Sequence, residues 1–161
     1  MNIKLKELKI KNYKEKIKKN LKEFGEIDIL HSDDMNEDER KFITTFYNDN
    51  SIFRFEFPIY NSGSQKYFDS LDTIKREALN TFERNLDIFN ISDRVKFFYS
   101  FNDEIFIIKC DFIKIKEQFA IFSEIDLPLL LYNEQKTAIL TLYKLEYVLE
   151  ISKWSALQIT S

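Results

Sequence analysis

The 161-residue sequence is poor in the residues on which many functional sites depend: it has two glycines, two prolines, one histidine and one cysteine. Gly25 and Gly63 lie far apart, so the sequence contains neither a glycine-rich phosphate-binding loop nor a dinucleotide-binding fingerprint. His31 and Cys110 alone cannot form a Cys/His zinc site or a disulfide scaffold within one chain. We therefore expect a protein without catalytic residues, without a metal and without a cofactor.

The sequence also lacks long apolar runs. None approaches the roughly 20 residues that cross a bilayer. The first residues alternate charged and apolar side chains, unlike the continuous apolar stretch of a secretory signal. A single cysteine suits a reducing compartment. We expect a cytoplasmic protein with no membrane partner.

What is present is the composition of a folded domain. Hydrophobic residues make up 44% of the chain, and 16 Phe, eight Tyr and one Trp provide material for a packed core. A chain of this length fits one domain over residues 1–161. We expect a basic helical segment at 1–24 and a short C-terminal tail at 152–161.

The charge is unevenly distributed along the chain. Residues 1–24 hold nine lysines and three glutamates, a net charge of +6, whereas the whole chain carries −3 and the remaining 137 residues therefore −9. A solvated helix face is the ordinary interpretation of such lysines. An arm for nucleic acid or membrane is the alternative, but no arginine or glycine accompanies the lysines and an acidic body repels phosphate. We expect no direct nucleic-acid partner.

Hydrophobic spacing predicts two principal helices, at about 11–24 and 65–89. Gly25 suits the position after the first helix. Residues 31–39 predict a solvated loop that runs into the start of a further helix, and the apolar residues of that helix would be Phe42, Ile43, Phe46 and Tyr47. A strand over these four residues is the alternative. Residues 112–123 fit neither period cleanly, and we favour a helix at about 114–122.

Runs with strand character lie at 26–30, 51–60, 94–101, 104–110, 127–132, 137–143 and 146–151. From these we expect about five or six strands, mostly antiparallel, with Asn102-Asp103 as a tight turn and Pro128 marking a sheet edge or a strand start. The order of the elements predicts an α+β fold with the two principal helices packed on one sheet face.

Three groups of residues are candidates for chemistry. His31 lies in an acidic stretch and is expected in a solvated loop, and Cys110 ends an apolar strand and is expected to be buried. Asp126, Glu134 and Lys136 match the loose pattern of metal-dependent nucleases, in which two carboxylates hold a divalent ion. That pattern needs Glu and Lys on one face of a strand, but here both fall in a predicted turn.

An acidic stretch is the strongest candidate for binding a partner. It contains Asp33, Asp34, Glu37, Asp38 and Glu39, five carboxylates in seven residues. Such charges repel each other unless a cation or a basic surface is near. Three interpretations of this stretch remain open. It is a solvated helix start, it pairs with the chain's own lysines, or it is a docking surface for a basic protein. Tyr132, Tyr143 and Tyr147, near strand ends, are further surface candidates.

The central and C-terminal two-thirds of the chain resemble a family. The stretches are 53–57, 78–83, 95–99, 126–133 and 146–150. Their layout resembles the small immunity proteins of bacterial polymorphic and contact-dependent growth inhibition toxin systems. The resemblance implies an acidic, cytoplasmic protein without catalytic motifs, and it assigns no role to any single residue.

Our leading hypothesis is accordingly a non-enzymatic immunity protein, a monomer or homodimer, that neutralises a cognate basic toxin, a nuclease, through an acidic surface. The alternatives are a phage-encoded inhibitor of a host defence nuclease, a small metal-dependent nuclease using Asp126, Glu134 and Lys136, and a dimeric adaptor domain.

Overall fold

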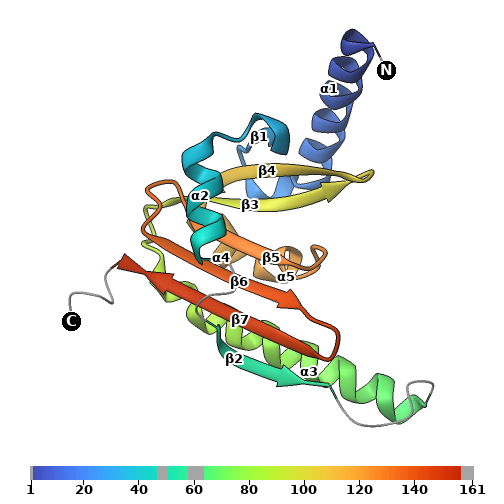
Figure 1. Cartoon of the computed structure of the whole chain (residues 1–161), viewed down its shortest axis with the longest axis vertical. Helices are drawn as coiled ribbons and strands as arrows, with labels where there is room; N and C mark the ends of the chain where they lie inside the picture. The colour runs from blue at the N-terminus through green and yellow to red at the C-terminus, as the bar shows by residue number, and fades with distance from the viewer. Residues whose placement is uncertain (1, 47–50, 58–63, 157–161) are drawn as a thin grey trace.

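The computed structural model describes residues 2–46, 51–57 and 64–156, and this part of the chain is built on one antiparallel sheet (Figure 1). Its strands are β1 (Asp28–His31), β2 (Ser51–Glu56), β3 (Arg94–Phe101), β4 (Glu104–Asp111), β5 (Leu129–Asn133), β6 (Ala138–Lys144) and β7 (Val148–Ser155). They lie in the order β1-β4-β3-β5-β6-β7-β2. The predicted α+β class is confirmed, but the sheet has seven strands rather than five or six.

The β3–β4 hairpin follows from local sequence. Asn102 and Asp103 connect the strands with φ angles of 48° and 64°, as a two-residue hairpin turn requires. Strand residues on either side alternate between the two sheet faces, so Val95 and Phe97 point to the same side. The predicted turn is confirmed.

Helix α1 (Ile3–Asn20) starts earlier than the sequence predicted. The Asn2 side chain accepts a hydrogen bond from the Lys4 backbone N–H at 2.9 Å and caps the first turn. Residues 3–10 therefore join the helix. After Asn20 a short 3₁₀ turn, Lys22–Phe24, leads to Gly25, whose φ of 76° is readily adopted by glycine.

Helix α3 (Gln65–Arg84) agrees closely with its prediction. Ser64 caps it by accepting a hydrogen bond from the Tyr67 backbone N–H at 3.1 Å. The helix continues as the 3₁₀ segment Asn85–Ile88. The end predicted at residue 89 thus includes this tighter last stretch.

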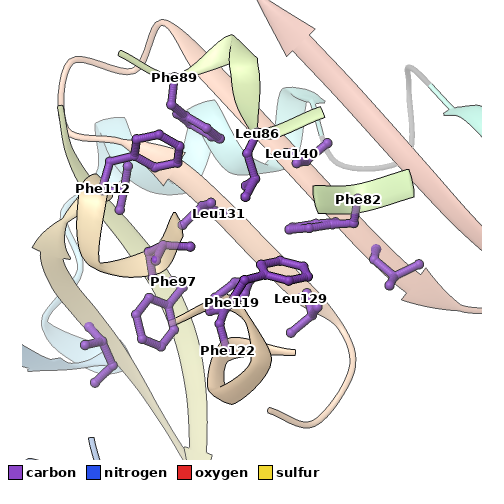
Figure 2. Close-up of a cluster of buried hydrophobic side chains, with 14 of the residues drawn as sticks. Phe82, Leu86, Phe89, Phe97, Phe112, Phe119, Phe122, Leu129, Leu131 and Leu140 are labelled. Atoms are coloured by element: carbon purple, nitrogen blue, oxygen red, sulfur yellow. The ribbon is translucent and has the colours of Figure 1, made fainter. Parts of the chain in front are cut away.

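The main core lies between the sheet and the helices α1, α3, α4 (Phe112–Glu117) and α5 (Phe119–Phe122). Figure 2 shows aromatic rings from several elements meeting there. Phe97 of β3 meets Phe122 edge-on at 5.3 Å between ring centroids, and Phe82 of α3 lies 6.0 Å from Phe122. Ile17 and Phe24 belong to the same cluster. The two principal helices therefore share one sheet face, as predicted.

Helix α2 (Glu37–Phe46) lies on the other sheet face. Its aromatic residues pack on Tyr132 and Trp154, with the Phe46 ring stacked on Trp154 at 4.1 Å. The alternative of a strand in the segment of Phe42, Ile43 and Phe46 is therefore wrong. Trp154 lies in β7, so the predicted tail at 152–161 begins too early.

Two further predictions need correction. Residues 114–122 form two short helices instead of one. β5 lies in the middle of the sheet, and Pro128 immediately precedes it, so the alternative of a strand start holds and that of an edge does not. Residues 58–60 of the strand predicted at 51–60 lie outside the described residues. Along the described ranges, no helix combines the length and apolar character that crossing a membrane requires.

Candidate functional site

The candidate site is the acidic segment, defined here as residues 32–39. It comprises a 3₁₀ turn, Ser32–Asp34, and the first turn of α2. The side chains that point into solvent are Asp33, Asp34, Glu37 and Asp38. Glu39 is the exception, since only 6% of it is exposed. Four of the five predicted carboxylates are therefore accessible to a partner.

Local hydrogen bonds hold this segment in one conformation. Asn36 Oδ1 accepts a bond from the Glu39 backbone N–H at 2.8 Å, which caps α2. The Arg40 guanidinium donates to the Ser32 carbonyl at 2.8 Å and to the Met35 carbonyl at 3.3 Å. Carboxylates in the first turn of α2 also meet the partial positive charge of the helix N-terminus.

His31 anchors the start of the segment. Its Nδ1 accepts a hydrogen bond from the Asp33 backbone N–H at 3.2 Å. Nε2 therefore carries the proton and donates to Glu104 Oε2 at 2.7 Å. The ring also meets Phe106 edge-on and is only 5% exposed. The expectation of a solvated histidine is wrong, because pairing of β1 with β4 brings Glu104 and Phe106 to it.

Glu39 anchors the other end. Lys96 Nζ donates to Glu39 Oε1, and Tyr132 Oη donates to Glu39 Oε2 at 3.1 Å. Burial, the negative charge of Glu39 and this hydrogen bond raise the pKa of Tyr132 well above its ordinary value, in that order of importance. The prediction that Glu39 and Tyr132 are surface residues is therefore wrong: Glu39 lies on the buried side of α2, and Tyr132 lies beneath that helix.

The other two tyrosines do not extend the acidic surface. Tyr143 is 4% exposed and its Oη donates to Glu150 at 2.7 Å, so the prediction of a surface side chain is wrong here too. Tyr147 is 71% exposed at the β6–β7 connection. The strands β3, β5 and β6 separate β7 from the β1–β4 pair beside the acidic segment. The structure does not bring Tyr147 to the candidate site.

The acidic segment is only partly neutralised by the chain itself. Lys6 Nζ lies 3.7 Å from Asp33, the pairing with the lysine helix that the sequence left open. Among the described residues, no cationic group lies within 4.0 Å of Asp34, Glu37 or Asp38. The segment therefore presents a net negative potential.

An open groove of about 500 Å³ separates the acidic segment from α1. One wall carries Asp33 and Asp34, and the other carries Ile3, Ile10 and several lysines of α1. The groove therefore offers apolar surface directly beside exposed carboxylates.

The nuclease pattern does not assemble. Asp126 precedes β5 and Glu134 follows it, so the two carboxylates lie at opposite ends of that strand. Glu134 pairs with Lys109 at 3.2 Å, and Lys136 lies in a turn with φ of 60°. Within ranges 2–46, 51–57 and 64–156, no three His, Cys, Asp or Glu side chains gather as metal ligands.

Cys110 occupies the core, as expected. It is fully buried, and burial, followed by the charge of Asp111, raises the pKa of its thiol to about 12. A thiol that stays protonated is a poor nucleophile. Cys110 therefore acts as a packing residue.

Comparison with known proteins adds no relative: no protein-family model, curated protein or solved structure matches the chain.

Sequence reasoning missed Lys96 and Glu104, the partners that hold the acidic segment. For Glu39 a signal was present, since Glu39, Phe42 and Phe46 recur at helical spacing and share one face of α2. The sequence contains no signal for Lys96 and Glu104, because their contacts depend on strand pairing over long sequence separations.

Proposed function

We propose that the protein is a non-enzymatic cytoplasmic immunity protein that binds and neutralises a basic toxin, a nuclease, through the acidic segment. The observation that carries this proposal is a segment whose exposed carboxylates are mostly unpaired while its two ends are fixed by buried polar contacts. Asp34, Glu37 and Asp38 are displayed between His31 and Glu39. The family resemblance supplies the class of partner.

Charge complementarity supports a nuclease as the partner. Nucleases have basic clefts because their substrates carry phosphate charge. An acidic surface opposite such a cleft accelerates diffusional encounter and disfavours wrong partners. The proposed inhibitor therefore occupies the position of the nucleic acid.

The anchoring supports tight rather than transient binding. A loop that orders only on binding loses conformational entropy at that step, whereas a segment already held in place avoids most of that cost. Ile3 and Ile10 in the adjoining groove can accept an apolar side chain of the partner. Apolar burial of this kind slows dissociation.

The first experiment tests the function itself. The product of the neighbouring gene is expressed, and its binding to the full chain is measured by calorimetry. We expect a stoichiometric complex and suppression of the partner's nuclease activity. Absence of binding to any neighbouring gene product contradicts the proposal, as does nucleic-acid cleavage by the chain alone that Glu134→Ala abolishes.

The second experiment tests the surface. The triple variant Asp34→Asn, Glu37→Gln, Asp38→Asn removes three exposed negative charges. We expect association at low salt to slow by about tenfold and its salt dependence to flatten. The matched control neutralises Asp72, Glu77 and Asp87, exposed on the opposite side of the sheet. Equal slowing in both triple variants would place the interface elsewhere.

A further inference from the structure

Helix α1 carries positive charge that the folded chain does not use, and part of it lies on the outer face, the side turned away from buried Ile17. Between Ile3 and Asn20 the helix holds eight lysines and two glutamates. Within the described part of the chain, Lys6 is the only one of these lysines with a carboxylate within 4.0 Å. Lys9 lies over the Tyr13 ring, 5.5 Å from its centroid. The remaining lysines are unpaired in the described structure.

Aliphatic side chains are exposed on the same helix. Leu5 and Leu8 are 59% and 54% exposed, and Ile3 is 75% exposed beside the groove. Leu8 lies nine residues before buried Ile17, so at about 100° per residue it points to the opposite side of the helix. In Figure 1 the N-terminal part of α1 stands clear of the sheet. Core packing therefore does not account for Leu5 and Leu8.

We propose that this outer face rests on an anionic phospholipid surface. Lys4, Lys16 and Lys19 lie on the same side of the helix as Leu5 and Leu8, and one carboxylate, Glu15, shares that side with them. A helix with lysines flanking aliphatic side chains can lie in the membrane interface, with its apolar groups in the headgroup–acyl boundary and its lysines at the anionic headgroups. This inference is independent of the proposed toxin binding and departs from the sequence-based expectation of no membrane partner.

The charges of the chain favour lipid over other occupants. A symmetric contact between two copies through this face is disfavoured because the second α1 would bring a second set of lysines to it. Nucleic acid would satisfy the lysines, but it offers no apolar environment to Leu5 and Leu8, and the face has no arginine or aromatic side chain for base contacts. An anionic bilayer satisfies both kinds of side chain.

The remainder of the molecule determines the orientation. The residues after 24 carry a net charge of −9 and are repelled by an anionic surface. The sheet is therefore held on the water side, with α1 between it and the lipid. Each lysine near an anionic leaflet strengthens binding about fivefold, and that gain is lost as salt screens the charges.

The test uses the full chain and co-sedimentation with two kinds of vesicle: phosphatidylcholine alone, and phosphatidylcholine with about one third phosphatidylserine. We expect binding to the anionic vesicles only, and release at high salt. The variant Lys4→Gln, Lys16→Gln, Lys19→Gln should bind about 100-fold more weakly. Its matched control, Lys41→Gln, Lys75→Gln, Lys116→Gln, changes the net charge equally at exposed sites outside α1 and should bind as the parent does.

A second variant separates insertion from charge. Leu5→Ser with Leu8→Ser keeps every lysine and should weaken vesicle binding at least about tenfold. Circular dichroism confirms that each variant remains folded. Equal binding to both vesicle types, no binding to either, equal loss in the lysine control, or tighter binding to duplex DNA than to anionic vesicles would each overturn the proposal.

Discussion

Glu39 is a carboxylate held inside the protein by two partners from the sheet. Lys96 supplies the neutralising charge, and Tyr132 supplies a hydroxyl donor. Such a buried pair adds little net stability compared with a well-packed apolar pair, but removing one partner leaves an uncompensated charge in a low-dielectric site. The interaction therefore fixes where α2 docks more than it adds to overall stability.

Lys96→Met should lower the free energy of unfolding by about 3 kcal/mol, because it leaves the buried Glu39 carboxyl group without its cationic partner. Urea denaturation measures this loss. The double variant Glu39→Leu, Lys96→Met should recover most of it, since neither buried charge remains. A single variant that costs no more than the double variant would show that the pair is not buried as described.

Cys110 gives a prediction about pH. Its pKa is raised from an ordinary value near 9 to about 12 in the folded chain, so the unfolded chain loses this proton first as the pH rises. The resulting contribution to stability is complete below about pH 9 and declines through pH 12, by roughly 1.4 kcal/mol per pH unit. Compared with Cys110→Ala, the parent should show this additional decline in urea denaturation at alkaline pH. Parallel curves for the two proteins would contradict the raised pKa.

At the scale of elements, α2 is held to its sheet face by aromatic contacts. Phe42 lies 5.9 Å from Trp154 and 6.1 Å from Tyr132 between ring centroids, and Phe46 stacks on Trp154. This smaller cluster is separate from the main core across the sheet. The docking of α2, and with it the position of the acidic segment, depends on these few rings.

Phe42→Ala should destabilise the protein by about 3 kcal/mol and shift the emission of Trp154, the only tryptophan, to longer wavelength as water reaches the indole. Phe68→Ala is the matched control, because Phe68 on α3 is 51% exposed. If both variants emit alike, α2 is not held by these contacts.

Elements with a strong local signal were predictable from the sequence. α3 has a sustained helical period and a Ser64 cap, and the β3–β4 hairpin has a two-residue turn at Asn102-Asp103. The central position of β5 was not predictable, because its pairing with β3, unlike its local pairing with β6, is a long-range contact that a short apolar run does not specify. The apolar run itself, buried on both faces, was the available hint.

In the candidate site too, some features were predictable from the local sequence and others depend on long-range contacts. The exposed carboxylates were visible as a run, and their exposure follows from repulsion and helix-start preference. The contacts that hold them were not visible, since His31 finds Glu104 and Glu39 finds Lys96 only once the sheet has formed. Burial of Tyr132 follows from α2 covering that face, whereas the sequence suggested helices on one face only.

At the scale of the molecule, one core joins distant parts of the chain. Ile17 of α1, Phe82 of α3 and Ile151 of β7 belong to the same buried cluster. The sheet connects this core to the α2 cluster, because residues of β5 and β6 alternate between the two faces. The described elements therefore depend on one another.

Unfolding should consequently occur as one cooperative transition. Trp154 fluorescence reports on the α2 face and far-ultraviolet circular dichroism on the helices of the main core. We expect the two signals to give the same midpoint in urea. Separate midpoints would show that the α2 face melts independently of the main core.

The position of β2 has a consequence for how the protein is made. β2 is synthesised before five of the other six strands, yet in the sheet it pairs with β7 alone, which leaves the ribosome after all six others. The backbone N–H and C=O groups of β2 that pair with β7, and the half-exposed ring of Phe53, therefore lack their partner strand until β7 has been synthesised. A nascent chain that stalls before β7 presents an unpaired strand, which is the kind of surface that chaperones bind and that aggregates recruit.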